Sequence, residues 1–165
     1  MKSIIIIRHA KSSWEFAESD FDRVLNERGH HDAPMMAKRL IEKKTKIDAF
    51  FSSPAKRALT TAEYFFKEYH TDTNSKSIIT IPELYHASST VFFNVIKNIS
   101  NDFNSIAVFS HNPGITDFVN QLTNTRIDNM PTCGVFAVNV KTDNWKDFAK
   151  AQKEFWFFDY PKLKD

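Results

Sequence analysis

The stretch Ile4-Ile5-Ile6-Ile7-Arg8-His9-Ala10-Lys11 decides how the rest of the sequence is interpreted. Its four consecutive isoleucines predict a short β-strand, expected at residues 1–7, that has no polar face. Such a strand is typically covered on both sides in a parallel sheet. It runs directly into Arg8 and His9, and open α/β sheets bind their ligands at the carboxyl ends of their strands. A cation and an imidazole in this position therefore predict a functional site.

The composition excludes several classes of protein. A chain of 165 residues suits one domain, expected to span 1–165. The net charge of +2 is too small to favour a nucleic-acid partner. Cys133 is the only cysteine, which excludes an internal disulfide and a cysteine zinc cluster. No run approaches the ~18 apolar residues of a membrane span, so we expect a cytoplasmic protein without a membrane partner.

Strand and helix patterns alternate along the chain, which predicts a three-layer α/β/α sandwich with helices on both faces of the sheet. The sheet is expected to be mostly parallel, with about six strands. The last two strands are adjacent in sequence, so one of them should be antiparallel. The strands are expected at 1–7, 47–51, 78–81, 106–109, 135–140 and 155–158, and a polar loop at 70–76.

Helix starts are marked by capping residues and prolines. Asn26 is a candidate N-cap for the first helix, but Pro34 lies inside the helical pattern. The helix therefore either kinks at Pro34 or starts later with Asp32 as its cap. In the second helix, Pro54 suits the first turn, with a preceding serine as the cap. Further helices are expected at 90–99 and 115–122.

Three of the predicted parallel strands are followed by side chains of catalytic type. Arg8 and His9 follow the first strand, Arg57 lies one turn into the helix after the second, and His111 follows the fourth. Because the carboxyl ends of parallel strands share one edge, these four residues are expected to meet in a pocket. Such a pocket, rich in cations and hydrogen-bond donors, suits a phosphoryl group.

The chemistry expected of this pocket is phosphoryl transfer to histidine. An unprotonated imidazole can attack phosphorus and form a phosphohistidine intermediate. The arginines and the second histidine would stabilise charge on the phosphoryl oxygens. We therefore expect no metal and no other cofactor. Glu83 follows the third strand at the same edge and is the candidate acid for the leaving group.

Three motifs in this order resemble those of the histidine phosphatase superfamily, which includes the phosphoglycerate mutases. They are Arg8-His9-Ala10, similar to the Arg-His-Gly signature, the segment 52–62 with its arginine, and the second-histidine segment 110–114. The resemblance covers nearly the whole chain. It implies that His9 is the phosphorylated nucleophile. The phosphoryl ligands that it implies are Arg8, Arg57 and His111.

The short chain leaves little room for the insertion that forms a lid in the mutases, so a mutase is not expected. The segments 8–14, 22–29 and 161–163 look like the small bacterial phosphohistidine phosphatase branch. That resemblance implies a phosphorylated signalling protein as the partner. A small phosphorylated metabolite is the alternative substrate, and a phospho-ligand binding module without turnover is the alternative from a different class.

Several residues keep two interpretations. Ala10 stands where the family has glycine, and Glu83 lies in a segment that only loosely resembles the family's acid motif. Glu83 is thus either the acid or a helix-capping residue. Arg23 is either an additional phosphate ligand or the ion-pair partner of Asp20 or Asp22. The last strand, 155–158, is expected at an edge of the sheet, either half covered by a helix or exposed as a contact surface.

Overall fold

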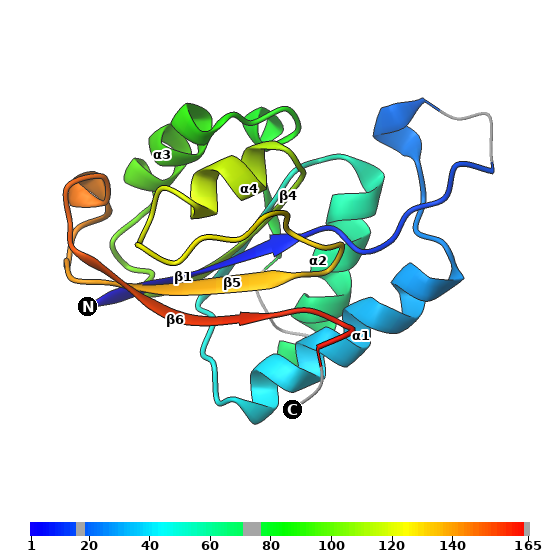
Figure 1. Ribbon diagram of the computed structural model, residues 1–165, viewed down its shortest axis with the longest axis horizontal. Helices are drawn as coiled ribbons and strands as arrows, with labels where there is room; N and C mark the ends of the chain where they lie inside the picture. Colours follow the sequence, from blue (N-terminus) through cyan, green and yellow to red (C-terminus); the bar gives the residue numbers. More distant parts are fainter. Residues whose placement is uncertain (16–18, 71–76, 164–165) are drawn as a thin grey trace.

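The computed structural model describes residues 1–15, 19–70 and 77–163, so the loop expected at 70–76 lies almost entirely outside the described residues. Six strands form one sheet in the order β3-β2-β4-β1-β5-β6 (Figure 1). Strand β5 is antiparallel to both of its neighbours, and the other pairings are parallel. This confirms the predicted mostly parallel sheet with one antiparallel strand. The strands are β1 (Lys2–Arg8), β2 (Ala49–Ser52), β3 (Ile79–Thr80), β4 (Ser105–Ser110), β5 (Val135–Val140) and β6 (Lys153–Asp159).

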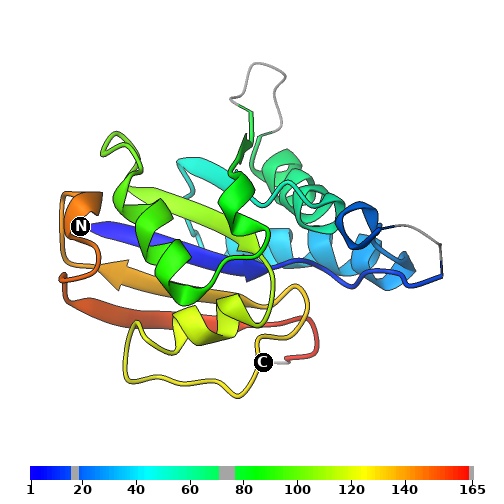
Figure 2. The same ribbon diagram turned by 90° about the horizontal axis from the view of Figure 1, so that it is seen from above.

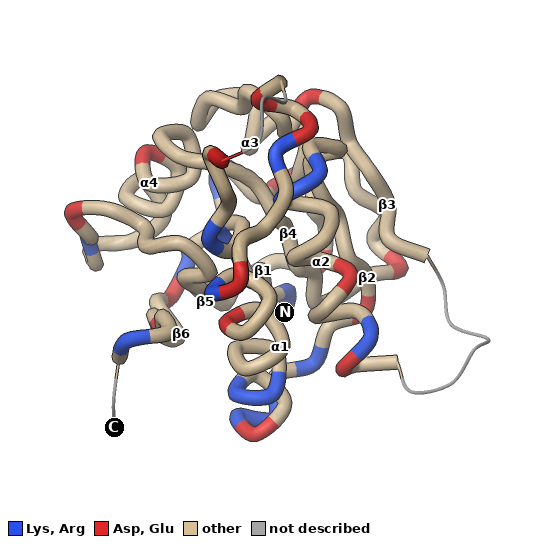
Figure 3. Tube along the Cα trace, turned by 90° about the vertical axis from the view of Figure 1, so that its right-hand side faces the viewer, with Lys and Arg blue, Asp and Glu red and all other residues tan. Residues whose placement is uncertain are grey.

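Helices cover both faces of the sheet, as predicted. Helices α3 and α4 lie on one side, and α1 and α2 pack against the other (Figures 1 and 2). The helices are α1 (Glu27–Glu42), α2 (Lys56–Tyr69), α3 (Ser89–Lys97) and α4 (Gly114–Val119). None of the described helices is long and apolar enough to cross a lipid bilayer. Basic and acidic residues are intermingled along the chain trace in Figure 3.

Strand β1 is buried on both faces. Ile4 and Ile6 join the core under α3 and α4, whereas Ile5 and Ile7 join the core under α1 and α2. All four side chains are 0% exposed. Because successive residues of a strand point to opposite faces, a run of isoleucines serves both cores at once. The prediction of a strand without a polar face is therefore confirmed.

The structure decides between the alternatives for the helix starts. Asn26 caps α1, because its side chain accepts a hydrogen bond from the Gly29 N–H at 2.9 Å. The helix continues through Pro34, so the later start at Asp32 is wrong. The predicted start of α2 is also wrong, because this helix begins after Ala55, beyond Pro54, and has no side-chain cap.

Strand β6 forms one edge of the sheet beside β5, which confirms its predicted position. Phe155 and Trp156 on this strand are partly exposed. Cys133, the only cysteine, is 0% exposed. Its backbone N–H donates to the carbonyls of Arg8 and His9 at 3.1 and 3.0 Å. The cysteine therefore helps to hold the chain where β1 ends.

Candidate active site

The carboxyl ends of β1, β2 and β4 meet at one edge of the sheet. Arg8 of β1 is in register with Ser110 of β4, and the His9 N–H donates to the Ser110 carbonyl at 3.1 Å. After β2, the Ser53 N–H donates to the Phe109 carbonyl of β4 at 3.0 Å. These hydrogen bonds extend the pairing past the strand ends. The segments that follow the three strands are consequently held side by side.

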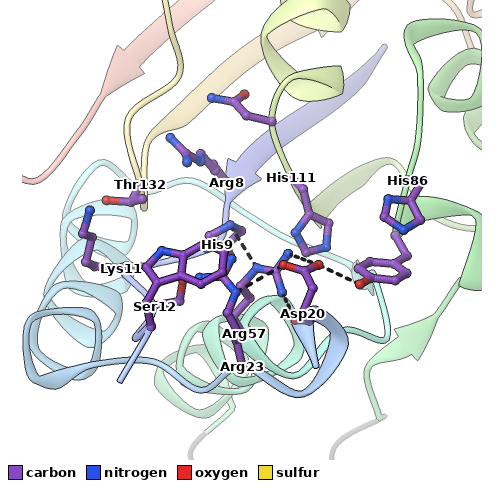
Figure 4. A pocket seen from close by; sticks show the side chains of 13 residues that line it. Arg8, His9, Lys11, Ser12, Asp20, Arg23, Arg57, His86, His111 and Thr132 are labelled. Atoms are coloured by element: carbon purple, nitrogen blue, oxygen red, sulfur yellow. Dashed lines mark hydrogen bonds and ion pairs between the residues drawn. The ribbon is translucent and has the colours of Figure 1, made fainter. Parts of the chain in front are cut away.

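A cavity of about 350 Å³ lies at this edge (Figure 4). Its lining includes the four residues predicted from the strand ends and, in addition, Arg23. The structure thus brings together Arg8, His9, Arg57, His111 and Arg23. Arg8 ends β1 and His9 follows it, and Arg57 lies in α2. His111 follows β4, and Arg23 lies in the connection before α1.

His9 is buried and held in one orientation. Its Nδ1–H donates to the Ala10 carbonyl at 2.8 Å, which leaves Nε2 as the unprotonated nitrogen. Nε2 faces the Nε of Arg57 at 3.4 Å. Burial lowers the pKa of His9 well below its usual value, and the nearby His111 and arginines lower it further. The ring is therefore neutral at physiological pH, as a nucleophile toward phosphorus must be.

Ala10 fits the site although the family has glycine here. Its N–H donates to the Thr61 hydroxyl at 2.9 Å, and that hydroxyl donates to the Arg57 carbonyl at 2.7 Å. Among the described non-glycine residues, only Lys44 and Cys133 have positive φ angles. Ala10 thus adopts a backbone conformation that is open to any residue, and Thr61 ties the first motif to the second.

Arg57 is buried and uses three different nitrogens. Nε faces His9, Nη1 donates to the Asp20 carbonyl, and Nη2 lies 3.1 Å from the Asp20 carboxylate. That carboxylate also accepts hydrogen bonds from the Tyr85 hydroxyl at 2.7 Å and from Arg23 Nε at 3.2 Å. The Tyr85 hydrogen bond, followed by the charge of Arg57, holds the pKa of Asp20 at about 2. Asp20 is therefore ionised at physiological pH.

Of the two interpretations of Arg23, the structure confirms the ion pair, and phosphate binding stays a prediction. Arg23 forms the expected ion pair with Asp20, and it also lines the cavity. Its Nη1 donates to the Ser12 hydroxyl at 2.7 Å, and its guanidinium lies 3.5 Å from the centre of the Trp14 ring. The Arg23 side chain therefore forms part of the pocket wall and is held there by its contacts with Ser12 and Trp14.

His111 lies next to His9, with the ring centres 5.2 Å apart. Its Nε2 lies 2.8 Å from the Ser53 hydroxyl oxygen. That oxygen accepts a hydrogen bond from the Ala55 N–H, so the Ser53 O–H is free to donate a hydrogen bond to Nε2. Nδ1 is buried and has no hydrogen-bond partner in the part of the chain that the structure describes. Burial, with the nearby Arg57 charge, lowers the pKa of His111 to about 3. The second histidine is therefore also neutral.

Arg8 is anchored at one nitrogen. Its Nη1 donates to the Met130 carbonyl at 2.8 Å, while its buried Nε has no partner among the residues described. Within these residues, no group of three or more histidine, cysteine or acidic side chains is arranged to hold a metal ion. The arginine and lysine side chains that line the cavity are Arg8, Arg23, Arg57 and Lys11.

Glu83 does not join the other predicted residues. In the short 3-10 helix Pro82–Leu84, Leu84 is buried and Tyr85, which follows it, lines the cavity. Glu83 points elsewhere, is exposed, and lines a separate apolar groove against α3. The sequence prediction put Glu83 at the right edge of the sheet, but Glu83 is not among the residues that line the cavity with His9. Its expected position in the site is wrong.

We therefore expect Glu83→Gln to leave kcat/KM for alkyl phosphates within about twofold of the wild type, since a group outside the pocket cannot protonate the leaving oxygen. Steady-state rates with an alkyl and an aryl phosphate would check this. A selective loss of about 100-fold or more on the alkyl phosphate would restore Glu83 as the acid.

Asp20 and Tyr85 are the site residues that the sequence did not reveal as such. The sequence indicates Asp20 only as a possible ion-pair partner of Arg23, and it does not indicate a role for Tyr85. Both come from irregular segments, where no periodic pattern indicates which side chain faces the pocket. The one available signal was the length of the polar connection at 10–30, since long connections are often functional.

Two neutral histidines and three arginines gathered at the carboxyl edge of an α/β sheet form a site that suits a phosphoryl group. The chain belongs to the histidine phosphatase superfamily: the sequence model of the histidine phosphatase superfamily (branch 1) matches residues 4–85. No curated protein matches the sequence.

The fold is similar to that of solved structures named as the phosphohistidine phosphatase SixA. The protein from Agrobacterium tumefaciens aligns with a TM-score of 0.78 and 23% identity over 97% of this chain and 99% of its own. A SixA complexed with tungstate aligns with a TM-score of 0.79 and 22% identity over 96% and 97%. The protein from Nakamurella multipartitia aligns with a TM-score of 0.81 and 19% identity over 98% and 97%. At these identities the likeness shows the fold.

Proposed function

We propose that this protein is a metal-independent phosphatase that removes phosphate from phosphohistidine on a signalling protein through a phospho-His9 intermediate. The observation that carries the proposal is the buried, neutral His9, whose unprotonated Nε2 faces Arg57 in the pocket. Only a neutral imidazole has a lone pair for phosphorus, and burial beside cations keeps it neutral.

In the proposed reaction, Nε2 of His9 forms a bond to phosphorus while the bond to the leaving nitrogen breaks, and the electron pair goes to the leaving imidazole. Water then attacks phospho-His9, which releases inorganic phosphate and restores the neutral ring. Arg8 and Arg57 hold the phosphoryl oxygens, as does Nδ1–H of His111. Arg23 adds positive charge at the same wall.

The choice of a protein substrate is supported by the entrance of the pocket. Trp14, which lines the cavity, is 77% exposed, and Asp20, which also lines it, is exposed as well. A phosphohistidine that projects from a folded partner can approach such an entrance directly. The similar structures named as SixA phosphohistidine phosphatases are in keeping with this choice.

A phosphotransfer domain phosphorylated on histidine is the substrate that tests the proposal. We expect inorganic phosphate to be released in the presence of EDTA, with kcat/KM at least about 100-fold above that for sugar phosphates or nucleotides. Higher rates on small metabolites would favour a metabolite phosphatase. Binding without phosphate release would indicate a binding module, and a loss with EDTA that added Mg²⁺ or Zn²⁺ restores would overturn the metal-free mechanism.

A further inference from the structure

The pocket has a cationic floor, but its entrance is anionic and aromatic. We infer that Asp20 is a specificity-determining residue that favours leaving groups with a positive charge, such as a protonated imidazole ring, over anionic leaving groups. This inference rests on the proposed function, because it assumes that the arginine floor receives the phosphoryl group. Asp20 would then face the other end of the substrate.

The position of Asp20 follows from its partners. Arg57, Arg23 and Tyr85 hold its carboxylate from three different segments of the chain. The side chain of Asp20 is 46% exposed, whereas those of Arg57 and Arg23 are 6% and 9% exposed. The carboxylate therefore lies between the buried guanidinium groups and the solvent, on the side from which a substrate enters.

The carboxylate still has capacity to bind a ligand. Among the residues that the structure describes, Oδ2 accepts hydrogen bonds from Arg57 and Tyr85, whereas Oδ1 accepts one, from Arg23. Because each carboxylate oxygen has two lone pairs, Oδ1 can accept a further N–H. The low pKa of Asp20 keeps this oxygen an acceptor at physiological pH. A donor with positive charge is the partner that it binds most strongly.

Aromatic rings pack against the side chains that hold this carboxylate. Tyr85 packs edge-to-face against Phe21, with the ring centres 5.1 Å apart, and Trp14 covers Arg23. Aromatic faces attract flat cations, so they suit an imidazolium ring. Lys11 and His86 also line the cavity, and Asp20 is the sole carboxylate among the described residues that do so. The selection for positive charge would thus depend on this one side chain.

The reaction step that Asp20 would assist is the departure of the imidazole. In protonated phosphohistidine, the ring nitrogen away from phosphorus carries a proton and donates it as a hydrogen bond to Oδ1. When Nε2 of His9 bonds to phosphorus, the old P–N bond breaks and its electron pair returns to the ring. The leaving group is then a neutral imidazole that keeps its proton. A leaving group with a carboxylate would instead be repelled by Asp20.

Asp20→Asn tests the inference, with Asp22→Asn as the matched control. Asp22 lies in the same short helix, is exposed, and contacts the Ser19 hydroxyl outside the cavity lining. The substrates are phosphohistidine and two esters, phosphocholine with a cationic leaving group and 3-phosphoglycerate with an anionic one. For Asp20→Asn we expect kcat/KM to fall about tenfold on phosphohistidine and phosphocholine and to rise on 3-phosphoglycerate. Asp22→Asn should keep the wild-type ratios.

Three results would overturn the inference. Equal losses on all substrates would mean that Asp20 only positions Arg57, and equal gains would mean that it only competes with the phosphoryl group. Unchanged ratios would remove any selective role. The two esters separate this test from the test of the proposed function. If the wild-type protein hydrolyses the esters but not phosphohistidine, only the proposed substrate is wrong, and the role of Asp20 can still be measured on the esters.

Discussion

Replacing His9 by alanine is expected to lower turnover by at least about three powers of ten, and to abolish acid-labile phosphate on the protein. The expectation follows from the hydrogen bond to Ala10, which leaves a single ring nitrogen, Nε2, free for phosphorus. Nearby hydroxyls such as Ser12 offer no substitute, because a hydroxyl needs a base to attack phosphorus. Brief incubation with ³²P-labelled substrate, followed by an acid quench and an alkaline quench, would measure both effects.

His31→Ala is the control for this substitution. His31 is an exposed histidine of α1 and does not line the cavity, so its loss should leave turnover unchanged. Thermal unfolding of both variants would check that the empty space left by His9 has not unfolded the protein. Phosphate that stays on a serine or on Cys133 after the acid quench would contradict the assignment of His9.

Replacing Arg57 by lysine is expected to lower kcat/KM by on the order of 100-fold, although the positive charge is kept. Arg57 reaches His9 through Nε and Asp20 through both terminal nitrogens. A lysine has one nitrogen and cannot span these positions or hold two phosphoryl oxygens at once. The loss corresponds to ~2–3 kcal/mol of transition-state stabilisation. Steady-state kinetics on an aryl phosphate would measure it.

Arg28→Lys is the matched control, because Arg28 is half exposed and pairs with Asp32 away from the cavity. The same chemical change there should leave kcat/KM within about twofold, as is usual for surface ion pairs. A near-wild-type rate for Arg57→Lys would show that only the charge of this residue matters. The fork geometry would then play no part in catalysis.

Arg8, His9, Arg57 and His111, which were predicted from the ends of β1, β2 and β4, all line one cavity in the structure. A run of isoleucines has one stable position, a central strand buried on both faces, and this position determines the edge at which Arg8 and His9 emerge. Arg57 and His111 follow strands parallel to β1, so topology alone places them at the same edge. The antiparallel β5 followed from the direct succession of the last two strands.

The site residues Asp20 and Tyr85 lie in irregular segments and could not be predicted from the sequence, because the directions of their side chains depend on contacts with distant parts of the chain. Glu83 and Tyr85 are two residues apart, yet only Tyr85 faces the cavity, and the burial of Leu84 between them sets that orientation. Asp20 reaches Arg57 across 37 positions of sequence, and no local pattern records that pairing.

The sequence by itself therefore determined the sheet and the four residues at its strand ends, since strand periodicity and parallel topology are local and repetitive signals. Only the tertiary structure decided which nitrogen of His9 is free, that both histidines are neutral, and that a carboxylate lines the cationic pocket. These properties arise from desolvation and from charges brought together by folding. Their strength depends on distances between atoms that are remote in the chain.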